Sequence, residues 1–266
     1  MKKRERCSET HHHPRDDVIT FDEGPHIYTV NGDSTYVSVT TLNKAYFEEF
    51  QEDVVIEKMA RGLPWVNDTF PIQGHKYYGM TRDEIKNQWE VTRVEASQAG
   101  TEMHKNIEEY YNGEPIESDS TEWSHFHKFL KDHSHLSPYR TEWMIWDADI
   151  KVAGSIDMVF QDSRDGAFYI YDWKRSKAID TDNRFRKFSH VPCISHIPDT
   201  NYGHYCLQLN TYKAILEKNY DMTIKGMYLV VLHPNSDSYQ KYAVPDLSKE
   251  MASLFELRKK EVEVTE

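Results

Sequence analysis

The sequence has few cysteines and no long apolar run. Its 266 residues include three cysteines, Cys7, Cys193 and Cys206, an odd and widely separated set that does not form the disulfide framework of small secreted domains. The longest aliphatic run, residues 228–232, is far shorter than the roughly 20 residues of a membrane-spanning helix, and no apolar segment follows Met1. We therefore expect reduced thiols in a soluble, intracellular protein that is neither secreted nor membrane-bound.

Basic residues are also scarce. The chain has 32 Lys and Arg against 44 Asp and Glu, so its formal net charge is −12. Because bulk attraction to nucleic acid comes from Lys and Arg that neutralise phosphates, this balance excludes binding through overall charge. A nucleic-acid role would need local basic segments or bound metal ions. Aromatic residues are abundant, since 17 Tyr, 11 Phe and 6 Trp supply the apolar surface of a folded core.

The first half of the chain is expected to form a tail, a hairpin and helices. Residues 1–17 mix charges without periodicity, which predicts a flexible tail; its three consecutive histidines could bind metal, although we favour a solvated terminus. Alternating apolar residues on both sides of the turn at 31–33 predict a hairpin. Helices are expected from 38 or 40 to 47, over 52–61, and from a capping box at 81–84 to about 112 with a break at Gly100.

The second half of the chain changes to short aromatic or β-branched runs bounded by turn residues, which predict strands. Strands are expected at 141–146, 151–160, 167–174, 226–233 and 239–244, with helices over 204–220 and from 247. This pattern indicates an α/β fold. We expect residues 18–99 to form a hairpin and a helical N-terminal extension, and residues 100–266 to form the core, both within one compact unit.

Two acidic residues carry the strongest chemical signal. If the turn at 162–166 is centred between Arg164 and Asp165, paired residues sum to 329, so Asp157 lies opposite Asp172 with Cβ atoms roughly 4.5–5.5 Å apart. Lys174 shares the face of Asp172, because side chains alternate along a strand. Facing carboxylates in apolar strands destabilise a sheet unless a cation lies between them, and Mg²⁺ or Mn²⁺ would remove the conflict. The alternative is an exposed hairpin with solvated acids.

This arrangement resembles the PD-(D/E)XK nuclease superfamily, and two further segments resemble its RecB-like exonuclease group. Residues 100–108 resemble the GxxxHxxxE helix of that group, and residues 208–212 resemble its QxxxY helix. The resemblance covers about residues 100–232 in the correct order. It implies a restriction-endonuclease-like core, in which a mixed central β-sheet is flanked by helices.

The resemblance also implies roles for individual residues. Asp157, Asp172, the Trp173 carbonyl and His104 would hold one or two Mg²⁺ or Mn²⁺ ions, and Lys174 would orient the attacking water and help to deprotonate it. The resemblance also implies that Gln208 and Tyr212 contact phosphates or hold Lys174. Supporting roles fall to Glu108 and Glu142. Without the resemblance, His104 is a surface histidine and Tyr212 is a core aromatic.

A basic segment follows the second acidic strand. It contains Lys174, Arg175, Lys177, Arg184, Arg186 and Lys187 against Asp180 and Asp182, which gives 6 − 2 = +4. Phe185 and Phe188 interleave with these charges, and rings next to cations suit single-stranded nucleic acid. We expect Arg175 and Lys177 to bind substrate. The alternative is a solvated charged loop.

The resemblance implies a metal-dependent nuclease that hydrolyses phosphodiester bonds in DNA without a covalent enzyme intermediate. We expect an exonuclease on single strands or free ends, acting in DNA replication, recombination or repair, with helices of residues 38–112 as a gate for the substrate. The alternatives are a structure-specific endonuclease, an RNA substrate, and a catalytically silent DNA-binding or scaffold protein. A helical interaction module would leave the Asp157 and Asp172 pairing unexplained.

Other metals are less consistent with the sequence. Some RecB-like relatives bind an iron–sulphur cluster through four cysteines, and this chain has three. Cys193, His196, His204 and Cys206 are a ligand set that zinc would accept, but their spacing matches no zinc finger that we know. We favour ordinary loop and helix roles for these four residues.

Overall fold

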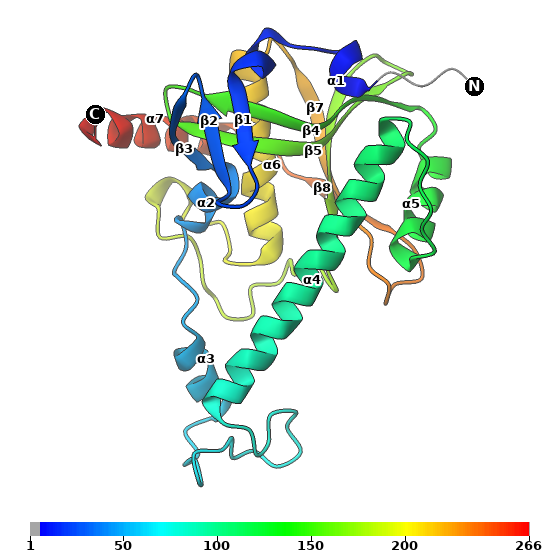
Figure 1. The fold of residues 1–266 in the computed structure, drawn as a ribbon. Coiled ribbons are helices and arrows are strands. Elements are labelled where there is room, and N and C mark those ends of the chain that lie inside the picture. The colour runs from blue at the N-terminus through cyan, green and yellow to red at the C-terminus, as the bar shows by residue number, and fades with distance from the viewer. Residues whose placement is uncertain (1–5, 266) are drawn as a thin grey trace. The chain divides into compact units, whose positions relative to one another are not determined.

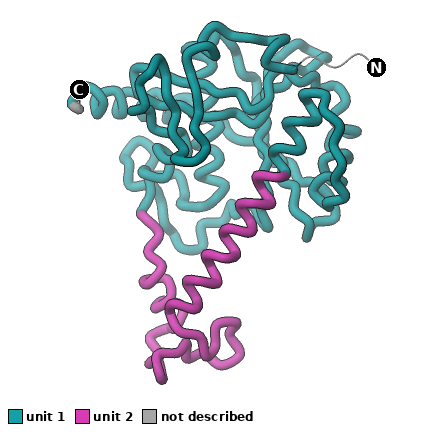
Figure 2. The backbone as a smooth tube through the Cα atoms, viewed as in Figure 1, with its two compact units in different colours: residues 1–48, 103–266 teal, residues 49–102 magenta. Residues whose placement is uncertain are grey.

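The protein divides into two units in the computed structural model, which describes residues 6–265. One unit comprises residues 1–48 and 103–266, and the other comprises residues 49–102 (Figure 2). The expected extension, residues 18–99, is therefore divided between the two units. Its first part belongs to the larger unit, because residues 37 and 38 pair with residues 152 and 153 of the core. The N-terminal strands therefore belong to the larger unit.

A mixed sheet forms the centre of the larger unit (Figure 1). Its strands are β1 (Ile19–Asp22), β2 (Ile27–Val30), β3 (Asp33–Ser38), β4 (Leu136–Asp147), β5 (Val152–Asp162), β6 (Phe168–Lys174), β7 (Ile224–Val231) and β8 (Gln240–Val244). The strand order is β1-β2-β3-β5-β6-β7-β8, and β4 also pairs with β5. The β3–β5 and β6–β7 pairs are parallel and the other pairs are antiparallel. The expected α/β class with a mixed central sheet is confirmed.

Helices cover both faces of this sheet (Figure 1). They are α1 (Cys7–Thr10), α2 (Val39–Lys44), α4 (Arg82–Tyr111), α5 (Thr121–Asp132), α6 (Asn201–Asn219) and α7 (Ser248–Thr265), with 3₁₀ turns η1 (Pro14–Val18) and η2 (Pro192–Ile194). On β6, Ile170 is buried with α2, α6 and α7, whereas Tyr171 is buried with α5 and the end of α4. Because neighbouring strand residues point to opposite faces, these helix groups lie on opposite sides of the sheet.

The β5–β6 hairpin has the predicted register. Met158 pairs with Tyr171 and Gln161 pairs with Phe168, and both pairs sum to 329. The ladder ends before Asp157, because β6 continues along β7 while β5 turns toward β3. Residues 154–157 of β5 therefore have no described strand partner on that side, which leaves a gap in the sheet where side chains can meet.

Several elements differ from the sequence predictions. The helix α4 runs through Gly100 without a break, because a single glycine costs only about 1 kcal/mol relative to alanine in a helix of 30 residues. The expected N-terminal hairpin has an additional strand, β1. A helix that the patterns above do not predict, α5, begins at the cap residue Ser120 and buries aromatic residues at helical spacing.

The N-terminal segment is not a solvated tail over its described part. Residues 7–10 and 14–18 form α1 and η1, while residues 1–5 lie outside the described chain. The Asp16 carboxylate accepts hydrogen bonds from Arg140 at 2.6 Å and from the Trp143 indole at 2.8 Å, both on β4. These partly buried polar contacts hold the segment against the sheet, which sequence periodicity cannot predict.

The smaller unit has a core of its own. It contains α3 (Glu52–Met59) and the first part of α4, and its buried residues include Ile56, Phe70 and Ile85. At its surface Arg82 lies over the Trp65 ring, with its guanidinium carbon 3.8 Å from the ring centroid.

None of the described helices, in either unit, has the length and apolar character that a membrane span requires.

Candidate metal centre

Three elements bring a histidine and two carboxylates together at the gap in the sheet. They are α4 with His104, β4 with Glu142 and β5 with Asp157, whose potential ligand atoms all lie within 4.8 Å of one another. His104 Nδ1 is 3.6 Å from Glu142 Oε1 and 3.6 Å from Asp157 Oδ2. The structure thus makes Glu142, which the sequence suggested only in a supporting role, a direct member of the cluster.

The ring of His104 is oriented by the backbone. Its Nε2–H donates a hydrogen bond of 2.9 Å to the Trp173 carbonyl in the orientation that leaves Nδ1 facing the carboxylates. Metal-binding histidines commonly donate their other ring N–H to a carbonyl or carboxylate, which fixes the tautomer and points the lone pair at the metal. The Trp173 carbonyl, which the resemblance implied as a metal ligand, here serves this orienting role.

Glu142 reaches the cluster through an unusual backbone conformation. Its φ is +43°, in the left-handed region that non-glycine residues rarely adopt in a strand. In the ladder of β4 and β5, Thr141 pairs with Met158 and Trp143 pairs with Ile156, so this register places Glu142 opposite Asp157. The Ser155 hydroxyl donates a 3.0 Å hydrogen bond to Glu142 Oε2 and leaves Oε1 toward His104. Such backbone strain is often retained at functional sites.

Asp157 is held where the alternation of β5 breaks. Ile156 is buried in the cluster with α2 and α6, whereas Met158 is buried in the cluster with α4 and α5. In a regular strand, residues two apart lie on the same face, so the alternation is interrupted at Asp157. The Trp173 N–H donates a 2.8 Å hydrogen bond to Asp157 Oδ2. Burial raises the pKa of Asp157, and the attraction of His104 opposes this only in part.

Asp172 and Lys174 form a second group, on the α6 side of the sheet. Lys174 Nζ is 2.6 Å from Asp172 Oδ2 and 3.5 Å from Gln208 Oε1. The Gln208 amide donates to the Tyr212 hydroxyl at 3.2 Å, so Gln208 contacts Lys174 and Tyr212 contacts Gln208. The Lys174 ammonium also lies 4.7 Å from the centre of the Tyr205 ring, a contact that the sequence motifs did not suggest.

The charges of the two groups act on one another. Burial raises the pKa of Asp172 to about 7, with repulsion from Asp157 as the second cause. Burial favours the neutral form of His104 and lowers its pKa. The negative charges of Asp157 and Glu142 have the larger effect and raise the pKa of His104 to about 9. Burial likewise opposes protonation of Lys174, yet Asp172 and Asp157 raise its pKa above the ordinary value. A protonated Lys174 can position a water molecule, but it cannot accept that water's proton.

The donor set fits a hard divalent cation. One imidazole and two carboxylates converge, and the 3.6 Å separations are below the about 4.2 Å that two ligands on opposite sides of a Mg²⁺ ion would span. Neither oxygen of the buried Asp172 accepts a hydrogen bond of good geometry from the described residues, although Lys174 is its ion-pair partner. A buried carboxylate with an unused oxygen is a further donor for a cation or its bound water.

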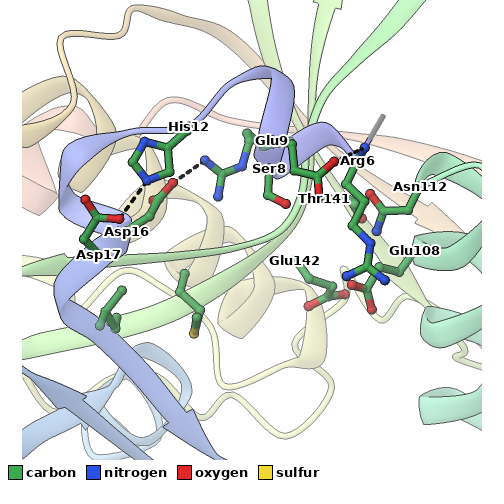
Figure 3. Close-up of a pocket in the computed structure, with 13 residues that line it drawn as sticks. Arg6, Ser8, Glu9, His12, Asp16, Asp17, Glu108, Asn112, Thr141 and Glu142 are labelled. Atoms are coloured by element: carbon green, nitrogen blue, oxygen red, sulfur yellow. Dashed lines mark hydrogen bonds and ion pairs between the residues drawn. The ribbon is translucent and has the colours of Figure 1, made fainter. Parts of the chain in front are cut away.

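Glu142 and Glu108 border a cavity of about 700 Å³ in the larger unit. Figure 3 shows Glu142 and Glu108 pointing toward one another, with the Arg6 guanidinium beside them. Burial raises the pKa of the Glu108 carboxyl, and repulsion from Glu142 adds to this. Glu108 thus lies beside Glu142, and the cavity gives access to that side of the cluster.

The residues expected to bind substrate differ in their environments. Arg175 is paired with Glu122 at 2.7 Å in a largely buried contact, so it supports the fold instead of facing solvent. Lys177 is exposed. Phe185 is 86% exposed at the tip of the loop that follows β6, between the exposed Arg184 and Arg186.

The four residues of the candidate zinc set have other contacts. His204 pairs with Asp199 at 2.9 Å and stacks on Phe47, and His196 lies 3.3 Å from Glu250. Cys206 is buried in the core and Cys193 is half-buried. Within residues 6–265 the His104, Glu142 and Asp157 group is the cluster with metal-ligand spacing.

Comparisons with known proteins add little to this geometry. No family model matches the chain, and no curated protein matches it. One solved structure, described as the crystal structure of SSO0001, is 12% identical with a TM-score of 0.29, over 52% of this chain and 55% of that chain. The chain spans about half the length of that protein, and so weak a likeness carries no argument.

Proposed function

We propose that this protein is a metal-dependent deoxyribonuclease with the restriction-endonuclease-like core of the RecB-like PD-(D/E)XK group. The observation that carries the proposal is that the cluster of His104, Glu142 and Asp157 lies beside the buried pair of Asp172 and Lys174. The histidine–carboxylate cluster supplies ligands for a divalent cation, and the lysine group beside it supplies a fixed positive charge. Phosphodiester hydrolysis needs both, because negative charge grows on the phosphate while water attacks.

The residues have separate tasks in this proposal. His104, Glu142 and Asp157 would hold Mg²⁺ or Mn²⁺, with Asp172 as a further donor, and the bound ion would lower the pKa of a water molecule and neutralise charge on the phosphate. Lys174 orients the attacking water and stabilises the charge that develops. Gln208 and Tyr212 hold Lys174 in place, and Tyr205 lies against its ammonium.

The loop after β6 favours single-stranded DNA as substrate. Its backbone is braced by Asn183, which donates to the Lys187 carbonyl at 2.7 Å and accepts from the Lys187 N–H at 3.0 Å. The tip therefore holds Phe185 in solvent between two arginines without burying it. A ring that bases can stack on, next to cations that attract phosphates, supports binding of unpaired strands. An exonuclease on single strands or free ends, acting in replication, recombination or repair, follows as part of the same proposal.

Cleavage of four labelled DNAs tests this function. Linear and circular, single- and double-stranded molecules are incubated with Mg²⁺, Mn²⁺ or EDTA. We expect metal-dependent loss of the linear single strand, with activity reduced at least about 100-fold in Asp157→Asn, Asp172→Asn and Lys174→Met. Asp165→Asn is the matched control, because Asp165 lies in the turn of the same hairpin and pairs with Lys225 at the surface.

The alternatives predict different outcomes. A circular single strand cut as fast as the linear one would exclude the exonuclease and favour a structure-specific endonuclease. Equal turnover by wild type and Asp157→Asn would show that the proposed metal centre does not carry the activity. Inactivity of folded wild type on all four DNAs, followed by inactivity on RNA, would leave a silent binding protein.

A further inference from the structure

Asn43 is a buried asparagine with unused hydrogen-bonding capacity. The residue is 3% exposed, and neither Nδ2 nor Oδ1 has a hydrogen-bond partner among the described residues. Burying an amide without partners costs free energy, which a leucine of similar volume at the same place would avoid. Its neighbour Leu42 shows that α2 accepts apolar residues here. The unused amide therefore calls for a functional explanation.

One face of α2 packs along α6. Val39 and Asn43 are four residues apart in α2 and therefore share a face, and two turn hydrogen bonds, from Tyr46 N–H to the Asn43 carbonyl and from Phe47 N–H to the Lys44 carbonyl, continue the chain to Phe47. At one end, a Cβ atom on Gly154 would lie 3.0 Å from Val39 Cγ2 and 2.8 Å from Tyr212 Cε1. Val39 therefore lies beside Tyr212.

The other end of this face is fixed as well. The Phe47 ring stacks on the His204 ring with centroids 4.0 Å apart. The chain from Val39 to Phe47 thus runs along α6 in the opposite direction, and Figure 1 shows α2 and α6 side by side. Asn43 is midway between Val39 and Phe47, and Gln208 is midway between Tyr212 and His204. The geometry places Asn43 at the level of Gln208.

We propose that Asn43 is a positioning residue for Lys174 that acts through Gln208, an inference that rests on the proposed nuclease function. Gln208 uses one oxygen lone pair for Lys174, at a long 3.5 Å, and one amide hydrogen for Tyr212. It retains one acceptor and one donor, which complement the free donor and acceptor of Asn43. Contact between the amides through one buried water fixes the Gln208 carbonyl toward Lys174.

Asn43→Leu tests this role, because it removes the polar atoms at nearly constant volume. We expect the melting temperature to stay or rise, kcat on single-stranded DNA to fall roughly 10- to 100-fold, and KM to stay, since a buried residue that orients Lys174 does not touch substrate. A structural asparagine would give the opposite pattern. Wild-type kcat in Asn43→Leu would overturn the proposal.

Asn210 provides the matched control. It is buried on α6, but its amide donates to the carbonyls of Cys206 and Pro245 at 2.8 and 2.9 Å and accepts from the Leu247 N–H at 2.8 Å. Asn210→Leu leaves those groups unpaired, so we expect a lower melting temperature with unchanged kcat per folded molecule.

A double-mutant cycle separates this proposal from the nuclease itself. The melting temperatures of Asn43→Leu, Gln208→Leu and the double variant do not depend on activity. We expect non-additive changes, because the two amides share an interaction. Additive changes in melting temperature would show that Asn43 and Gln208 do not interact, even if the enzyme is active. Non-additive changes in a protein that cleaves no DNA would retain the link between the amides and overturn its role in catalysis.

Discussion

Glu142 has two unfavourable features. Its φ of +43° lies in the left-handed region, and its carboxylate lies beside those of Asp157 and Glu108, which repel it unless a cation is bound. We expect Glu142→Gln to lose at least about 100-fold in nuclease activity and to bind Mn²⁺ more weakly, because an amide is a poorer ligand for a hard cation. Activity assays and Mn²⁺ titration by calorimetry measure the two effects.

The control for this substitution is Glu109→Gln on α4, where Glu109 lies 3.8 Å from Lys105. It should retain wild-type activity and Mn²⁺ affinity. Wild-type Mn²⁺ affinity in Glu142→Gln would show that Glu142 is not a ligand and that its conformation has a structural cause.

At the scale of elements, local patterns predicted the hairpin that carries the site. The turn between β5 and β6 set the register, and alternation placed Lys174 on the face of Asp172. The composition of the cluster could not be predicted in the same way. It depends on the positive φ of Glu142 and on β5 leaving β6 for β3, and both are products of tertiary packing with no sequence period.

The N-terminal segment shows the same limit and gives a prediction about stability. Burial works to raise the pKa of Asp16, but hydrogen bonds from the His13 N–H, Arg140 and Trp143 outweigh it and lower the pKa below 3.8. Asp16→Asn leaves the Arg140 charge buried and unpaired. We expect a loss of about 2–3 kcal/mol in the free energy of unfolding at pH 7, somewhat less than for a fully buried pair.

The sign of the pH dependence follows from the lowered pKa. The folded protein binds this proton more weakly than the unfolded chain does, so the contribution is complete above the ordinary pKa of 3.8 and is lost as pH falls through the lower folded value. Urea unfolding at pH 7 and at decreasing pH should show the difference between wild type and Asp16→Asn shrinking below about pH 4. A constant difference would mean that packing, not the ion pair, holds the segment.

For the whole molecule, the proposed metal centre gives a prediction about stability. The cluster concentrates carboxylates at a gap in the central sheet, and a cation that binds only the folded state stabilises that state by mass action. At a Mn²⁺ concentration about 100 times Kd, the melting temperature should rise by about 5–10 °C. Differential scanning fluorimetry with Mn²⁺ or EDTA measures the shift. An equal shift in Asp157→Asn would place the bound ion elsewhere.

Net charge limits how the protein could bind the single-stranded DNA that we propose as its substrate. A chain of net charge −12 repels DNA as a whole, so binding must come from local contacts such as those of Arg184, Phe185 and Arg186. In EDTA, which prevents cleavage, Phe185→Ala should weaken single-strand binding about tenfold and leave duplex binding unchanged, because stacking requires unpaired bases. Leu257→Ala, an exposed apolar residue on α7, should change neither affinity. Equal weakening for single strands and duplexes would indicate that Phe185 shapes the loop, and the preference for single strands would then have to arise at another surface.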